Sequence, residues 1–112
     1  MLAKTTAACA AVLALAAAPP ALAQSKQDKK MVKLVAECAY VTKMAEGNGA
    51  KLRNPAAMWE QALANVAMQM KIDPVPYINE ARAKYKKRER VMGSGDAVRS
   101  MIKRAKDCDA QL

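Results

Sequence analysis

The chain has 112 residues, with 19 Lys or Arg against 10 Asp or Glu, a formal net charge of +9 at pH 7, and no histidine. The lack of histidine excludes Ser-His and Cys-His catalytic pairs, histidine metal sites and the C-x-x-C-H attachment of c-type haem. It also argues against most hydrolytic mechanisms. We therefore expect a protein that is not an enzyme and holds neither a metal nor a cofactor.

The first 23 residues predict a cleavable secretory signal peptide. Lys4 precedes a run of Ala, Val and Leu that ends at the two prolines 19–20, and A-L-A follows at 21–23. Signal peptidase accepts the small residues of an A-x-A pattern, and the apolar run is too short to span a bilayer. The residues up to Cys9 faintly resemble a lipoprotein cleavage box, which would predict a lipid anchor on Cys9. Almost no apolar run precedes this cysteine, which argues against the anchor. We expect cleavage after Ala23 and a single periplasmic or secreted domain, 24–112, whose net charge is +8 once Lys4 is removed.

Two cysteines remain in the mature domain, Cys38 and Cys108. A domain of this size buries only roughly 60% of its unfolded surface, and small exported domains commonly add disulfides. An even cysteine count in an oxidising compartment therefore predicts one intramolecular bond. Closing a loop of about 70 residues is worth roughly 4 kcal/mol in the chain-entropy model. Because Cys38 lies past the middle of the first predicted helix and Cys108 near the end of the last, these helices must be staggered or cross obliquely.

Two amphipathic helices are predicted in the first half of the mature domain. Over 26–46, apolar residues recur at spacings of three and four, and Gly47 follows as a stop signal. Asn54 as N-cap and Pro55 at the first helical position predict the start of the second helix. The predicted inner faces are Met31, Leu34, Val35, Cys38, Val41 and Ala45 in the first helix, and Met58, Trp59, Ala62, Leu63, Val66 and Met70 in the second.

A third helix is predicted after Asp73 and Pro74, which repeat the same start signal. Glycines at 93 and 95 end it, and Ser94 is expected to cap a fourth helix. The predicted inner faces are Ile78, Ala81, Tyr85 and Met92 in the third helix, and Val98, Met101, Ile102, Ala105, Cys108 and Leu112 in the fourth. No segment alternates as a strand does, so the expected fold is all-α, with three or four helices joined by one disulfide.

The third helix carries a dense basic face, which is the strongest compositional signal in the mature chain. The candidate partner- or anion-binding residues are Arg82, Lys84, Lys86, Lys87 and Arg90. In a cytoplasmic protein such a run would suggest nucleic acid. Export makes an acidic envelope protein, anionic lipid or lipopolysaccharide the expected partner instead. The competing interpretation is that the run is only a solvated helix face that aids solubility.

Three other patterns are better explained by structure than by chemistry. Ser100-Met-Ile-Lys103 matches S-x-x-K, but the S-D-N and K-T-G motifs that accompany it in penicillin-recognising enzymes are absent. The seven mature methionines could offer soft copper ligands, yet most fall on the apolar stripes, where methionine fills a core without Phe. Asp107 and Asp109 flank Cys108, and we expect them to hold that helix end in water.

The sequence therefore predicts a small exported helical binding or accessory protein. Its basic helix would dock on an acidic protein or an anionic envelope surface, steered by long-range charge. A periplasmic stress chaperone or an immunity-like inhibitor is the alternative, because small exported helical domains with one disulfide occur in both roles. Without histidine, only the 10 carboxylates could make such a chaperone respond to acid.

Overall fold

The computed structural model describes residues 26–111, which form four helices and contain no strand. These helices are 26–47, α2 (Ala56–Met70), α3 (Val75–Met92) and α4 (Ser94–Asp109). The contacts divide the chain into two units, Met1–Lys30 and Met31–Leu112. The all-α prediction is confirmed for the described residues. The predicted signal peptide, Cys9 and Leu112 lie outside them.

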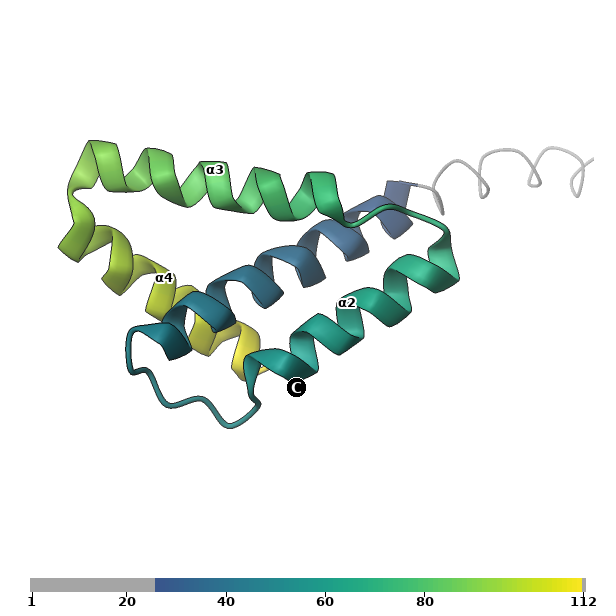
Figure 1. The fold of residues 1–112 in the computed structure, drawn as a ribbon, viewed down its shortest axis with the longest axis horizontal. Coiled ribbons are helices and arrows are strands. Elements are labelled where there is room, and N and C mark those ends of the chain that lie inside the picture. Colours follow the sequence, from purple (N-terminus) through teal and green to yellow (C-terminus); the bar gives the residue numbers. More distant parts are fainter. Residues whose placement is uncertain (1–25, 112) are drawn as a thin grey trace, which may run out of the picture. The chain divides into compact units, whose positions relative to one another are not determined.

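Helix 26–47 is the element around which the second unit is built. Its buried side chains are Val32, Val35, Ala36, Cys38, Ala39, Val41, Thr42 and Ala45. Because adjacent residues such as Val35 and Ala36 are both buried, the buried arc is wider than the stripe of a helix that packs on one side only. In Figure 1 this helix runs between α2 and α3, and α4 crosses it. The buried hydroxyl of Thr42 donates to the carbonyl of Cys38 at 2.6 Å, so no polar group is stranded there.

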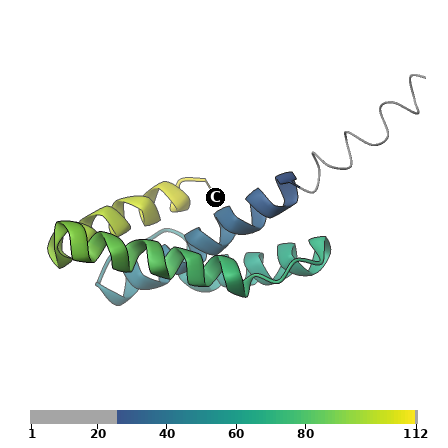
Figure 2. The same ribbon diagram turned by 90° about the horizontal axis from the view of Figure 1, so that it is seen from above.

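The other three helices have different relations to this central helix and to one another. In Figure 1 α2 runs antiparallel to helix 26–47, whereas α3 runs parallel to it. Figures 1 and 2 show α3 and α4 meeting at the turn that joins them and diverging from it. α3 and α4 contact each other, but α2 has no Cα within 8 Å of either. Helix 26–47 therefore lies between α2 and α3 and separates them.

The helix starts differ from the predicted capping in two of three cases. Asn54 does not cap α2; the N–H of Ala56 is accepted instead by the carboxylate of Glu46, from the last turn of helix 26–47. Asp73 does accept the N–H of Val75 at 3.0 Å, as expected for the start of α3. Ser94 makes no capping bond and is the first residue of α4, which follows Gly93 at φ 90°.

The apolar faces were predicted well at their centres and poorly at their edges. Trp59 and Leu63 in α2, Ala81 and Tyr85 in α3, and Met101 and Ala105 in α4 are buried as predicted. The predictions for Met31, Leu34, Met58 and Met92 were wrong, because these side chains are exposed. In helix 26–47 Val32 and Ala36 are buried although they were not predicted to be. In α2 the same is true of Ala56, while Met92 lies in the last turn of α3, beside the Gly93 break.

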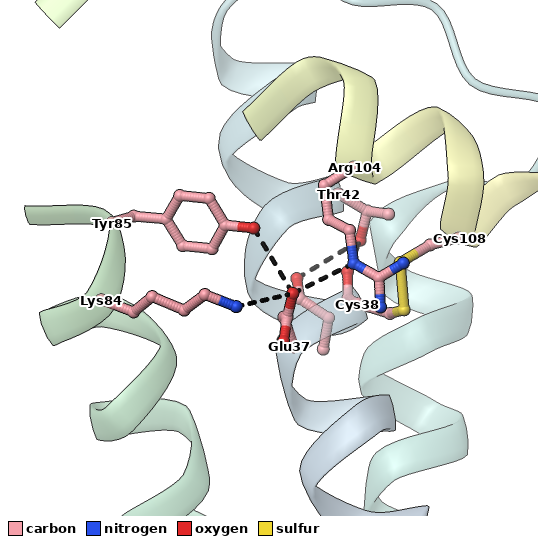
Figure 3. Close-up of a disulfide and its surroundings, with 8 residues drawn as sticks. Glu37, Cys38, Thr42, Lys84, Tyr85, Arg104 and Cys108 are labelled. Carbon is pink, nitrogen blue, oxygen red and sulfur yellow. Dashed lines mark hydrogen bonds and ion pairs between the residues drawn. A yellow bond between two sulfur atoms is a disulfide. The ribbon is translucent and has the colours of Figure 1, made fainter. Parts of the chain in front are cut away.

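The predicted disulfide between Cys38 and Cys108 is present, with the two Cα atoms 5.7 Å apart. It joins the middle of helix 26–47 to the last turns of α4 (Figure 3). Both cysteines are fully buried. The oblique crossing of the two helices in Figure 1 explains how a mid-helix cysteine meets one near a helix end.

We expect loss of this bond to destabilise the domain by about 4 kcal/mol, because the bond closes a long loop in the unfolded chain. The measurement is urea unfolding of the oxidised protein, the reduced protein and Cys38→Ala/Cys108→Ala, followed by circular dichroism. Reduction and double substitution should both move the unfolding midpoint to lower urea. Equal midpoints for the oxidised and reduced protein would contradict the prediction.

Candidate anion-binding surface

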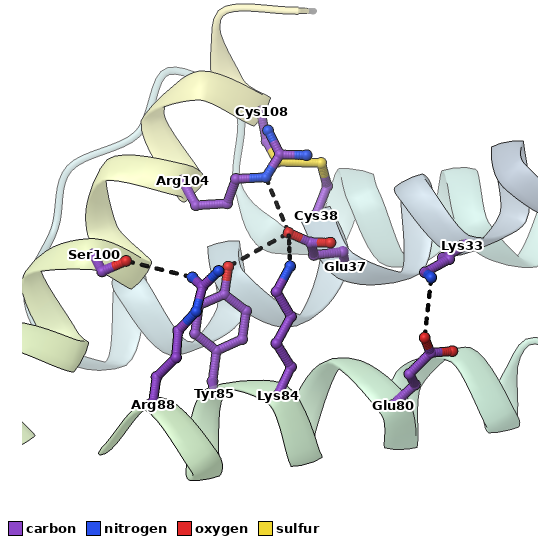
Figure 4. Close-up of polar contacts among 10 residues, drawn as sticks. All are labelled: Lys33, Glu37, Cys38, Glu80, Lys84, Tyr85, Arg88, Ser100, Arg104 and Cys108. Atoms are coloured by element: carbon purple, nitrogen blue, oxygen red, sulfur yellow. Dashed lines mark hydrogen bonds and ion pairs between the residues drawn. A yellow bond between two sulfur atoms is a disulfide. The ribbon is translucent and has the colours of Figure 1, made fainter. Parts of the chain in front are cut away.

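The cations of α3 divide into two sets that face different parts of the protein. Lys84 and Arg88 are four residues apart and so lie on one side of the helix. Figure 4 shows their side chains directed toward Glu37 of helix 26–47 and toward Ser100 of α4, respectively. Arg82, Lys86 and Arg90 form a second row at the same spacing on another side. We call Arg82, Lys86 and Arg90 the outer stripe.

Glu37 is the centre of the inward set. A single carboxylate oxygen, Oε1, accepts from Arg104 Nε at 3.0 Å and from the Tyr85 hydroxyl at 3.4 Å, and it lies 3.5 Å from Lys84 Nζ (Figures 3 and 4). Its side chain is only 15% exposed. Three helices therefore meet at one carboxylate. Glu37 was not among the residues predicted from the sequence, although an acid between the apolar pairs 35–36 and 38–39 could have indicated a partly buried charge with partners.

Burial alone would raise the pKa of Glu37, because it disfavours the charged form. The hydrogen bond from Arg104 and the positive charges of Lys84 and Arg104 outweigh burial, so the pKa lies below its ordinary value of 4.5. The carboxylate is therefore ionised at neutral pH. Its negative charge offsets the repulsion between Lys84 and Arg104, whose charged groups both lie beside it.

Tyr85 carries the remaining inward contacts of α3. Its ring stacks with Tyr40 at a centroid distance of 6.0 Å, and the guanidinium of Arg88 lies 5.0 Å from its centroid. Burial, followed by the negative charge of Glu37, raises the pKa of the Tyr85 hydroxyl, which keeps it protonated as a donor. Lys84 thus has a structural partner in Glu37, while its role in binding a partner stays a prediction.

The outer stripe borders two hollows. Arg82 and Lys86 line an open groove of about 720 Å³ between helix 26–47, α2 and α3. Lys86 and Arg90 line a shallower hollow near the start of α4, together with Glu89 and Ser94. Within the described residues, no carboxylate lies within 4.0 Å of a charged nitrogen of the outer stripe. Lys87 is exposed but lines neither hollow.

The prediction that Asp109 is exposed to water at the end of α4 was wrong, because this residue has a structural role. Its side chain is almost fully buried instead of holding the end of α4 in water. Its carboxylate accepts the backbone N–H groups of Arg53 and Asn54 at 2.7 and 2.8 Å, and the side-chain amide of Asn54 at 3.0 Å. The hydrogen bond from the Arg53 backbone is the main reason that its pKa is lowered. Asp109 thus fastens the segment before α2 to the end of α4.

Among residues 26–111, no group of three or more His, Cys, Asp or Glu side chains could hold a metal ion. No helix in the same range is both long and apolar enough to cross a membrane. No family model matches the chain, and neither the curated proteins nor the solved structures gave a match. Any function assigned to this protein therefore rests on the positions and charges of its own side chains.

We expect Glu37→Gln to lower the free energy of unfolding by about 2 kcal/mol at neutral pH, because charge-assisted hydrogen bonds are lost and Arg104 and Lys84 remain close together. The matched control is Glu80→Gln, which removes a carboxylate whose partner, Lys33, is as exposed as itself, at 56%. Such surface pairs contribute little. Urea unfolding checks both variants, and equal losses would contradict a special role for Glu37.

The stabilising effect of Glu37 should disappear in acid. Because its pKa is lowered on folding, its contribution is complete above the ordinary value of 4.5 and is lost as the pH falls through the folded value. The stability gap between the unsubstituted protein and Glu37→Gln should therefore be constant near pH 7 and close at low pH. Unfolding curves along a descending pH series measure this gap. A gap that persisted in strong acid would show that charge is not its cause.

Proposed function

We propose that this protein is a small, exported, non-catalytic binding protein that docks on an acidic partner protein through the outer stripe. The observation that carries the proposal is the division of the α3 cations. Lys84 and Arg88 face inward to Glu37, Tyr85 and Ser100, whereas Arg82, Lys86 and Arg90 have no compensating carboxylate among the described residues. A row of uncompensated charge on one flank attracts and orients an oppositely charged surface.

A protein partner fits this row better than a membrane surface does. Three cations one helical turn apart span about 12 Å, which matches carboxylates spaced along a helix or an acidic patch. Interfacial helices back their cations with bulky Trp, Phe and Leu side chains. The chain contains no Phe, and its single Trp, Trp59, is buried. The signal-like first 23 residues and the lack of histidine support export and a non-catalytic role.

Docking is tested by affinity capture from native envelope extract with the purified oxidised protein, eluted by a salt step. The variant Arg82→Glu/Lys86→Glu should capture at least about tenfold less of the acidic partner than the unsubstituted protein does. The reason is that surface charges at an interface attract the partner in a salt-dependent way. Lys87→Glu/Lys103→Glu, with the same charge change on exposed sites outside the stripe, should retain it. Capture that does not change with salt concentration, or an equal reduction of capture in both variants, would contradict the proposal.

The Glu37 cluster favours a second candidate, a chaperone activated by acid. Protonation of Glu37 would leave Lys84 and Arg104 without their shared carboxylate at the meeting point of three helices, and the strongly positive chain would then tend to open. Suppression of client aggregation at low pH, and none at pH 7, would support this role. Absence of suppression at both would remove it.

A further inference from the structure

The groove between α2 and α3 differs from an ordinary surface hollow in its construction. Its floor is helix 26–47, which contributes Ala39 and Tyr40, and its apolar walls include Leu63 and Ala64 of α2 and Ile78 of α3. No Cα of α2 lies within 8 Å of one in α3, so the backbones of these two helices do not close over the groove. It lies in the size range of small-molecule sites, which are roughly 300–1,000 Å³ and mostly apolar with a few polar groups.

The groove is polar at one end and apolar at the other. The pairs Lys33–Glu80 and Glu37–Lys84 advance by four residues on both helices, so helix 26–47 and α3 run parallel and in register. Lys43 and Lys86 therefore lie toward the end where these helices finish. Ile78 and Pro74 lie toward the other end, where α3 begins. Arg82 lies between the two ends.

The three cations that line the groove are available to a ligand to different degrees. Lys43 already lies 3.6 Å from Glu60, across the groove on α2. Lys86 and Arg82 have no carboxylate within ion-pair distance among residues 26–111. The ammonium of Lys86 at the polar end and the guanidinium of Arg82 one turn away are suited to a carboxylate, which an arginine can bind through two parallel hydrogen bonds.

We infer that this groove is a binding site for one long-chain fatty acid. The carboxylate would lie between Lys86 and Arg82, beside Ala39 and Ala64, and the acyl chain would run along α3 toward Ile78 and Pro74. The head-to-tail polarity favours this ligand over an acidic amphipathic helix, which would carry charge along its whole length. Among the residues that line the groove, none at the Ile78 and Pro74 end is charged. The inference does not depend on the docking of a partner protein.

The test titrates the oxidised protein with dansyl-labelled undecanoate below its micelle-forming concentration and displaces it with hexadecanoate. We expect saturable binding of one molecule and its displacement by hexadecanoate. Hexadecyltrimethylammonium, which has the same chain and a positive head, should not displace the probe. Lys86→Glu should weaken binding at least about tenfold, since a charge-assisted contact becomes repulsive. Lys87→Glu makes the same charge change outside the groove and should leave binding unchanged.

Ala64→Phe tests the trough itself. Ala64 is exposed and lines the groove, so the larger ring should fill it without entering the core. Binding should be lost while the circular dichroism spectrum and urea midpoint stay the same. Binding that survives Ala64→Phe, displacement by the cationic amphiphile, or no saturable binding at all overturns the inference. Arg90→Glu separates the two proposals, because Arg90 belongs to the outer stripe but not to the groove: it should weaken partner capture and leave fatty-acid binding intact.

Discussion

The burial of helix 26–47 on several sides is the constraint on which the rest of the structure depends. A helix with so wide an apolar arc must be covered by more than one neighbour. It is joined to α2 by Glu46, to α3 by Glu37 and to α4 by the Cys38–Cys108 bond. Because no Cα of α2 lies within 8 Å of α3 or α4, we attribute its position chiefly to the central helix and to the hydrogen bonds that Asp109 accepts from the segment before it. The groove is a direct consequence of this arrangement.

One carboxylate determines what the basic helix can do. Glu37 draws Lys84 and Arg104 inward, and Tyr85 beside it holds Arg88 against its ring. The cations left over are those on the other flank of α3, beside the groove. Thus the same contacts that fasten α3 to the core also sort its charges into a compensated set and an uncompensated one. A run of lysines and arginines that looks uniform in the sequence is divided by the fold.

Much of the fold could be predicted from the sequence, but less of the site could. The spacing of apolar residues predicted the helices, and two cysteines in a small domain that was expected to be exported predicted the disulfide, because both signals are local or permit a single pairing. Periodicity could not show that Val32, Ala36 and Ala39 are buried as well, since it reports one face and the first helix has several neighbours. Nor could it place Glu37 or Asp109, whose partners lie 47 to 67 and 55 to 56 residues away. Which α3 cations stay free follows from these long-range contacts.

An open apolar groove is unexpected in so small a domain. A chain of this length has little core to spare, and covering the half-buried Tyr40 and Ile78 and the exposed Ala64 by closer approach of α2 and α3 would add buried apolar area. The disulfide and the Glu37 cluster supply stability by other means and hold α3 and α4 on the central helix while α2 stays apart. Natural proteins depart from optimal packing chiefly where a site requires it. A trough that is kept open, apolar along its floor and basic at one end therefore supports a binding role better than solvation does, because solvation alone would need the charges but not the trough.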